Sequence, residues 1–216
     1  MDVAAGLAGL LAGLAAGPLA DRLATNAPIR RPLLASAPRS RSFPLVVSGT
    51  AALGAAVGVA FGFTLEAAAA TVFCWILVIV TRTDLEHRLI PNRIVVPGTV
   101  LVLVLRTLAE PSPAWLLAAV AAGALLFVVA LVYPQGMGMG DVKLAAFLGA
   151  GLGASVAVAL FVGFLSAVVP AVVLIARHGR AARTLPIPLG PFLALGAVVA
   201  LFFGDSILDW WADSGA

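Results

Sequence analysis

Long apolar runs separated by short polar loops constrain the fold of this 216-residue chain more than any other feature. A bilayer core of about 30 Å needs roughly 20 apolar residues for each spanning helix. Of all residues, 62% are hydrophobic and only 11% are charged, as in chains whose solvent is mostly lipid. We therefore predict an all-α, polytopic membrane helix bundle of about eight transmembrane helices. The predicted helices are residues 3–20, 44–63, 66–82, 94–109, 114–133, 142–153, 155–176 and 187–204.

One apolar run, residues 144–176, is too long for one span and short for two full ones. We place a turn within it at residues 149–154, where the sequence reads GAGLGA. The runs are rich in Ala, Leu, Val and Gly without the apolar/polar alternation of outer-membrane strands, so a barrel is not expected. The helix that starts near Asp141 is then shorter than the hydrocarbon core.

Orientation follows from the cations, because Lys and Arg accumulate in short cytoplasmic loops. With the N-terminus outside, the cytoplasmic cations are Arg22, Arg30, Arg31, Arg39, Arg41, Arg82, Arg88, Arg93, Lys143, Arg177, Arg180 and Arg183. The acids on the outer side are Asp2, Glu66, Glu110, Asp205, Asp209 and Asp213. Arg106 is the one cation left on the outer side, where we expect its side chain to snorkel to the interface.

The chain divides into three predicted parts. Residues 1–63 hold the first helices and a short basic cytoplasmic loop at 21–43, residues 64–204 form a membrane-embedded core, and residues 205–216 form a short outer tail. The single cysteine, Cys74, excludes a disulfide within the chain and a cysteine-based zinc site. Nothing in the composition suggests nucleic-acid binding.

Two cytoplasmic segments concentrate the remaining polarity. The first, DLEHRLIPN, starts with Asp84 about half a turn after the third predicted helix. The second is GMGMGDVK, in which glycine occupies every second position up to Gly140 and Asp141 follows at the start of the sixth predicted helix. Carboxylates at membrane depth are costly and are normally paired or functional. Both aspartates are therefore candidate site residues.

Simpler interpretations exist for each aspartate. Asp141 can cap its helix, where free amides and the helix dipole favour a carboxylate. Capping does not explain the glycines at 136, 138 and 140, which suit positive φ or the close approach of another backbone. Asp84 can form a surface ion pair with Arg82 or Arg88.

Together the two aspartates indicate a different chemistry. Both are placed on the cytoplasmic face at the ends of membrane helices, so a bundle can bring them together. Two carboxylates that share one proton can hydrolyse a peptide, since the ionised group activates water and the protonated group polarises the carbonyl. Such a dyad titrates as a pair, so the sequence does not assign the acid or the base.

The pattern GMGD at residues 138–141 followed by Lys143, with the upstream segment DLEHRLIPN at 84–92, resembles the type IV prepilin peptidases. These are membrane aspartyl proteases with a GxGD motif, and the resemblance covers mainly residues 67–177. It implies that Asp84 and Asp141 are the catalytic pair. It also implies that Gly138, Gly140, Lys143, Pro91 and Asn92 shape the loops or bind substrate.

The resemblance implies cleavage of the basic leader from type IV prepilins or pseudopilins in a bacterial cytoplasmic membrane, with the active site facing the cytoplasm. Larger family members carry a cytoplasmic domain with paired CxxC motifs after their first helix. Residues 21–43 contain no cysteine, so the chain resembles a compact, peptidase-only form, and neither zinc nor another cofactor is expected. The expected partners are prepilin-type precursors and membrane lipids, and the sequence predicts no oligomeric state.

Two alternatives stay open. The first is another GxGD protease, such as a preflagellin or presenilin-like enzyme, although Thr83 precedes Asp84 where presenilins have tyrosine. The second is a transporter with an ion site at a broken helix. A transporter site is expected near the midplane of the membrane, whereas the charge topology places both aspartates at the cytoplasmic rim.

Overall fold

The computed structural model describes residues 2–29, 31–134, 136–178 and 187–214. Within these ranges the chain forms eight α-helices and one short 3₁₀ turn, without a strand, which confirms the all-α prediction. In chain order the elements are α1 (Val3–Asn26), α2 (Phe43–Phe61), α3 (Leu65–His87), α4 (Asn92–Ala109), α5 (Ala114–Val132), α6 (Met139–Leu152), η1 (Gly153–Ser155), α7 (Val156–His178) and α8 (Gly190–Ser214).

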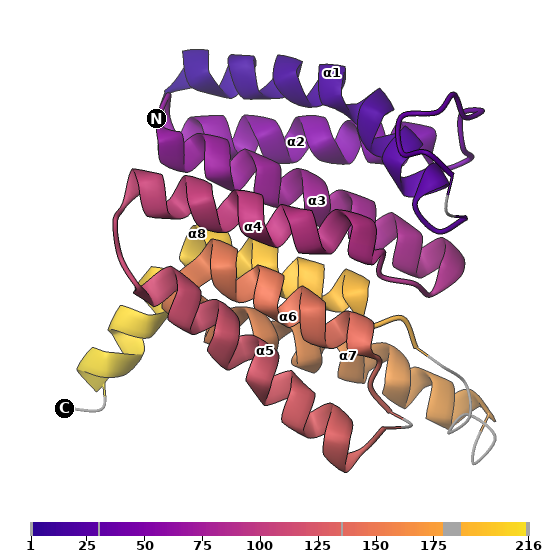
Figure 1. Cartoon of the computed structure of the whole chain (residues 1–216). Coiled ribbons are helices and arrows are strands. Elements are labelled where there is room, and N and C mark those ends of the chain that lie inside the picture. The colour runs from indigo at the N-terminus through magenta and orange to yellow at the C-terminus, as the bar shows by residue number, and fades with distance from the viewer. Residues whose placement is uncertain (1, 30, 135, 179–186, 215–216) are drawn as a thin grey trace.

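Seven apolar helical stretches in these ranges are long enough to cross a membrane, with α6, η1 and α7 counted as one stretch of 39 residues. The predicted turn within this stretch is confirmed, because α6 ends at Leu152 and α7 begins at Val156. Gly153 has a φ of +58°, a conformation that suits glycine. Figure 1 shows α7 running back toward the end of the bundle at which α6 begins.

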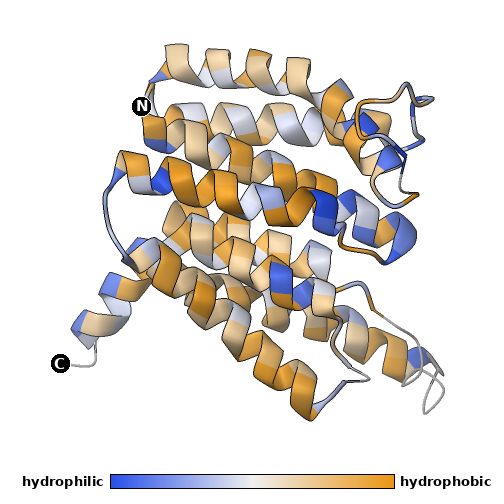
Figure 2. Ribbon diagram, in the orientation of Figure 1, coloured by the Kyte–Doolittle hydropathy of each residue, from blue (hydrophilic) through white to orange (hydrophobic). Residues whose placement is uncertain are grey.

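The helices pack side by side, so their connections gather at two ends (Figure 1). The α3–α4 and α5–α6 connections and the start of α8 lie at one end, which we call the site end. Both chain termini lie toward the other end. Figure 2 shows apolar residues along the middle of the helices and hydrophilic residues gathered mainly near the ends. Of the cations used to predict orientation, Arg30, Arg180 and Arg183 lie outside the described residues.

Glycines let α1 and α2 approach closely. A Cβ at Gly9 would lie 2.0 Å from the carbonyl oxygen of Gly54, and a Cβ at Gly54 would lie 2.4 Å from the carbonyl oxygen of Gly9. Small residues at such contacts let helices associate in lipid, where apolar burial drives association weakly. The first two helices therefore form a tight pair against α3.

Aromatic packing holds α3 against α6. The rings of Phe73 and Phe147 are fully buried and stack with centroids 4.9 Å apart. Gly151 makes room for this contact, since a Cβ there would lie 2.4 Å from Cδ2 of Phe73. The two helices that carry the candidate aspartates thus share one core.

Several predicted helix ends are wrong. The helix α1 continues to Asn26, α3 to His87 and α8 to Ser214, while α6 begins earlier, at Met139. Falling hydropathy marks where a chain leaves lipid, but helical hydrogen bonds continue beyond that point wherever polar side chains find partners. Residues 205–214, predicted as a tail, are therefore helical, and the first basic loop starts after Asn26.

Candidate active site

Asp84 lies in the last turn of α3. The sequence had suggested that it lies in the loop after this helix. Its residue is only 6% exposed. Its Oδ2 accepts a hydrogen bond of 2.8 Å from the backbone amide of Gly190, the first residue of α8. Buried carboxylates need such partners. The start of α8 therefore holds a carboxylate that lies 106 residues earlier in the sequence.

The simpler interpretation of Asp84, as a surface carboxylate paired with Arg82, is wrong. Arg82 instead forms ion pairs with Asp21, at 2.8 Å, and with Glu86, at 3.2 Å. Arg88 ends α3 with a left-handed backbone, φ 51°, and its amide donates to the carbonyl of Asp84. This conformation is uncommon for a residue other than glycine and turns the chain toward α4.

Asp141 is the third residue of α6 and is half-buried. Its Oδ2 accepts from the amide of Gly138 at 3.2 Å, and its own amide donates to the Gly138 carbonyl at 3.0 Å. This is the first-turn capping that the sequence suggested as one interpretation. The cap also fixes the carboxylate at the positive end of the helix dipole, which favours a negative charge.

The structure brings Asp84 and Asp141 to the same place. Two cavities, of about 270 and 320 Å³, are each lined by both aspartates together with Arg88 and Gly138. The first cavity continues between the α3–α4 connection and α6, and the second continues toward Pro134 and residues 187–189.

Gly138 and Gly140, which precede Asp141, have different surroundings. A Cβ at Gly140 would lie 3.1 Å from Cβ of Ile90, so the glycine lets α6 pack against the α3–α4 connection. Gly138 lines both cavities, and a Cβ there would lie 3.4 Å from the Asp141 carboxylate. Neither residue has a positive φ, so turn geometry requires glycine at neither position, and close approach accounts for Gly140 alone.

The remaining predicted site residues lie beside the first cavity. Lys143 Nζ donates to Asn92 Oδ1 at 3.1 Å, which joins α6 to the first turn of α4, and both residues line the cavity. Pro91 is buried at the start of α4, and its carbonyl accepts from the amides of Ile94 and Val95. Lys143 therefore links α6 to α4 on the wall of this cavity.

Sequence reasoning missed two contributors. Gly190 and the adjoining residues 187–189 reach the aspartates from far along the chain, and only the sequence IPLGP, with proline on both sides of Gly190, marks the segment. Arg88, considered from the sequence only as a cytoplasmic cation and a possible surface partner of Asp84, lines both cavities.

A buried ionic cluster supports the α3 end from the side of α1. The guanidinium of Arg82 donates to Asp21 Oδ1 at 2.8 Å, to the Asp21 carbonyl at 2.7 Å and to Thr25 Oγ1 at 2.9 Å. Asp21 also accepts from Ser40 Oγ at 2.6 Å. Asp21 was predicted to open a basic loop, but it lies inside α1 and is 2% exposed.

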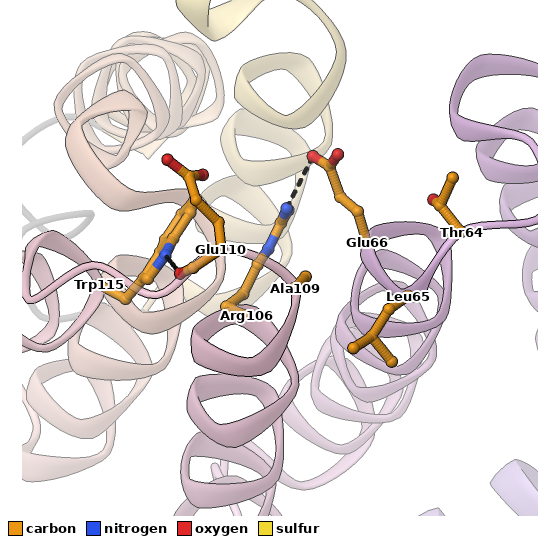
Figure 3. Close-up of a pocket in the computed structure, with 7 residues that line it drawn as sticks. All are labelled: Thr64, Leu65, Glu66, Arg106, Ala109, Glu110 and Trp115. Atoms are coloured by element: carbon orange, nitrogen blue, oxygen red, sulfur yellow. Dashed lines mark hydrogen bonds and ion pairs between the residues drawn. The ribbon is translucent and has the colours of Figure 1, made fainter.

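Among the described residues, a further cavity of about 210 Å³ lies at the opposite end of the bundle (Figure 3). Glu66 of α3 and Arg106 of α4 point toward each other there and pair at 2.9 Å. The Arg106 guanidinium lies 5.1 Å from the ring centre of Trp115. Arg106 is 5% exposed, so the prediction that it snorkels to the interface is wrong. A carboxylate and an aromatic face let its charge stay within the protein.

Replacing Arg106 by methionine tests whether this cavity, at the end of the bundle away from the two aspartates, takes part in the chemistry. We expect Arg106→Met to lower the free energy of unfolding by about 1 kcal/mol, because Glu66 is half-exposed and its ion pair is screened by water. Activity should stay near the native rate, since the residue lies at the far end of the bundle. Thermal unfolding in detergent and a cleavage assay measure both effects. Loss of cleavage in a folded variant would contradict this separation.

The fold and the site together define a polytopic membrane protein with two neighbouring carboxylates at one end, and aspartic proteases also place two carboxylates together. Comparison with known proteins agrees with this class. The model of the type IV leader peptidase family matches residues 71–176. The chain belongs to this family.

Curated relatives are each named prepilin leader peptidase/N-methyltransferase. The Bacillus subtilis relative is 37% identical over 174 residues, which cover 78% of this chain and 69% of the relative. The Legionella pneumophila relative is 31% identical over 81% of this chain and 63% of its own length. The Pseudomonas aeruginosa relative is 34% identical over 77% of this chain and 60% of its own length. No solved structure matches the chain significantly.

Proposed function

We propose that this protein is a membrane aspartic endopeptidase that removes the basic leader from type IV prepilins or pseudopilins, with Asp84 and Asp141 as its catalytic dyad. The observation that carries the proposal is that both carboxylates, from the ends of two different helices, line the same two cavities. Family membership supports peptidase chemistry, and the names of the relatives support a prepilin substrate.

The dyad would act on a water molecule between its carboxylates. One ionised carboxylate takes a proton from the water while the protonated carboxyl polarises the scissile carbonyl. The Gly138 amide on Asp141 and the Gly190 amide on Asp84 hold one oxygen of each group. Because the two aspartates titrate as a pair, the roles of acid and base belong to the dyad and not to either residue.

The proposed location of the dyad is the cytoplasmic face of a bacterial plasma membrane. Arg88, Arg93 and Lys143 lie at or beside the site end, and cations of short loops favour the cytoplasm. A basic leader joined to an apolar helix would place its junction at this depth. An epitope after Ser214 should accordingly be reached by protease only from outside the cell.

Co-expression with a candidate pilin precursor tests the proposal directly. The expected result is a pilin whose N-terminal mass shows loss of the leader. The same mass reports methylation, which the names of the relatives include and which the dyad by itself does not supply. An uncut precursor in the presence of inserted enzyme, with several precursor types tried, would contradict the proposed activity.

Cleavage is expected to survive chelation. Across the described ranges, no three His, Cys, Asp or Glu side chains gather as a metal site requires. Prepilin cleavage in detergent should therefore proceed at the same rate with and without a strong chelator. Loss of activity that added zinc restores would overturn the metal-free dyad.

A further inference from the structure

The start of α8 reaches the dyad through one buried contact. The Gly190 amide donates to Asp84 Oδ2 at 2.8 Å, and both residues are buried. The three preceding residues, 187–189, line the 320 Å³ cavity together with both aspartates. The segment therefore forms part of the wall of the site while its last amide holds a catalytic carboxylate.

The contact follows from how a helix begins. The first amides of a helix have no partner within it. Pro191 has no amide hydrogen, and the amides of Phe192 and Leu193 donate to the Leu189 carbonyl at 3.1 and 3.0 Å. The Gly190 amide is thus a free donor at the positive end of α8, and a carboxylate is the partner that such a position favours.

Only glycine fits at position 190 without a shift. A Cβ there would lie 2.8 Å from Asp84 Oδ2 and 3.2 Å from both Cβ and Cγ of Asp84. The nearest atoms all belong to the short Asp84 side chain, which has only two rotatable bonds with which to move away. Any larger residue at 190 must therefore displace the carboxylate or α8.

We propose that Gly190 is a positioning residue for the dyad: its amide holds the Asp84 carboxylate in the cavity it shares with Asp141, and its missing side chain allows that contact. This proposal rests on the proposed function, because it assigns Gly190 a role in prepilin cleavage. It extends the site to a third segment, residues 187–190, which neither aspartate motif contains.

The first test measures cleavage of a synthetic prepilin by Gly190→Ala in detergent. Since a displacement of about 1 Å can cost about 100-fold in rate, we expect kcat to fall by about that factor while KM stays within about twofold. The shape of the pH–rate profile should also change, because Asp84 loses its amide partner. A merely structural defect would lower the folded fraction and leave both kcat per folded enzyme and the profile unchanged.

Gly49→Ala is the matched control. Gly49 lies in α2, and a Cβ there would meet only the side chain of Val78, at 3.6 Å. It makes the same chemical change in a membrane helix without a clash, so native kcat, KM and pH profile are expected. Native kinetics in Gly190→Ala as well would overturn the proposal.

A double-mutant cycle tests the contact between Gly190 and Asp84 through protein stability, without a cleavage assay. Gly190→Ala should destabilise the protein. In an Asp84→Ala background Oδ2, at 2.8 Å, and Cγ are gone and only Cβ, at 3.2 Å, remains, so most of the loss should disappear. Recovery of folding in the double variant supports the contact even if Gly190→Ala alone does not fold. Additive losses would overturn it. Should Asp84→Asn cleave at the native rate, the proposed function fails, while the cycle still decides the contact.

Discussion

Replacing either aspartate of the proposed dyad by asparagine is expected to lower prepilin cleavage by about 10⁴-fold or more, as for other catalytic groups that act as a unit. Asparagine keeps the shape and still accepts the Gly190 amide at Asp84 or the Gly138 amide at Asp141. It carries neither a negative charge to activate water nor an acidic proton to polarise the carbonyl. Insertion and thermal stability should therefore stay close to native while activity is lost.

The double variant, Asp84→Asn with Asp141→Asn, should be no slower than the single variants, because each alone already disables the pair. Asp205→Asn provides a matched control. Asp205 also lies in a membrane helix and accepts a hydrogen bond, from Ser155 Oγ at 2.5 Å, but it belongs to the half of α8 that lies away from Gly190. Native activity in Asp84→Asn or in Asp141→Asn would refute the dyad. If Asp205→Asn also lost its activity, the losses at positions 84 and 141 would not be specific to the dyad.

Removing Arg82 is expected to have the largest effect on stability. Arg82→Leu leaves Asp21 charged and buried at 2% exposure, with Ser40 still bound but without its cation. Breaking a buried pair in this way costs about 3–5 kcal/mol. We expect a loss of that size in unfolding experiments in detergent, and a lower yield of inserted protein.

The matched control is Arg93→Leu. Arg93 is an exposed arginine of α4 that donates to the Arg31 carbonyl, and its loss should change stability little. A second comparison is Arg82→Leu combined with Asp21→Leu, which removes both charges and should recover much of the loss. If Arg82→Leu is as stable as the native protein, or if the double variant is no better than the single one, the cluster does not support the α3 end as described.

Much of the site could be predicted because its two aspartates stand in local motifs. Asp141 follows glycines at the start of a helix, and Asp84 precedes IPN by a few residues, so the sequence alone pointed to both. Helix ends were predicted less well. Hydropathy falls at Arg82, yet α3 continues through Asp84 to His87 because Arg82 and Asp84 both find buried partners.

Long-range contacts set the rest of the site. The Gly190 amide and the Asp21 carboxylate lie 106 and 61 residues from their partners on α3, and no local pattern specifies either contact. Arg106 shows the same limit, since an arginine near a helix end can reach the interface or pair within the bundle. Only the position of Glu66 and Trp115 on neighbouring helices decides that it stays buried.

The sequence by itself determined the class of this protein, since apolar runs of membrane length have to satisfy their backbone groups as helices in lipid. It also determined the break before α7, because a run of residues 144–176 does not suit a single span. Only the tertiary structure decided how the charges are held: which carboxylate meets which amide, and that Asp84 and Asp141 share their cavities. These contacts join helices distant in sequence, and their geometry depends on packing such as the Phe73–Phe147 stack, which no single segment encodes.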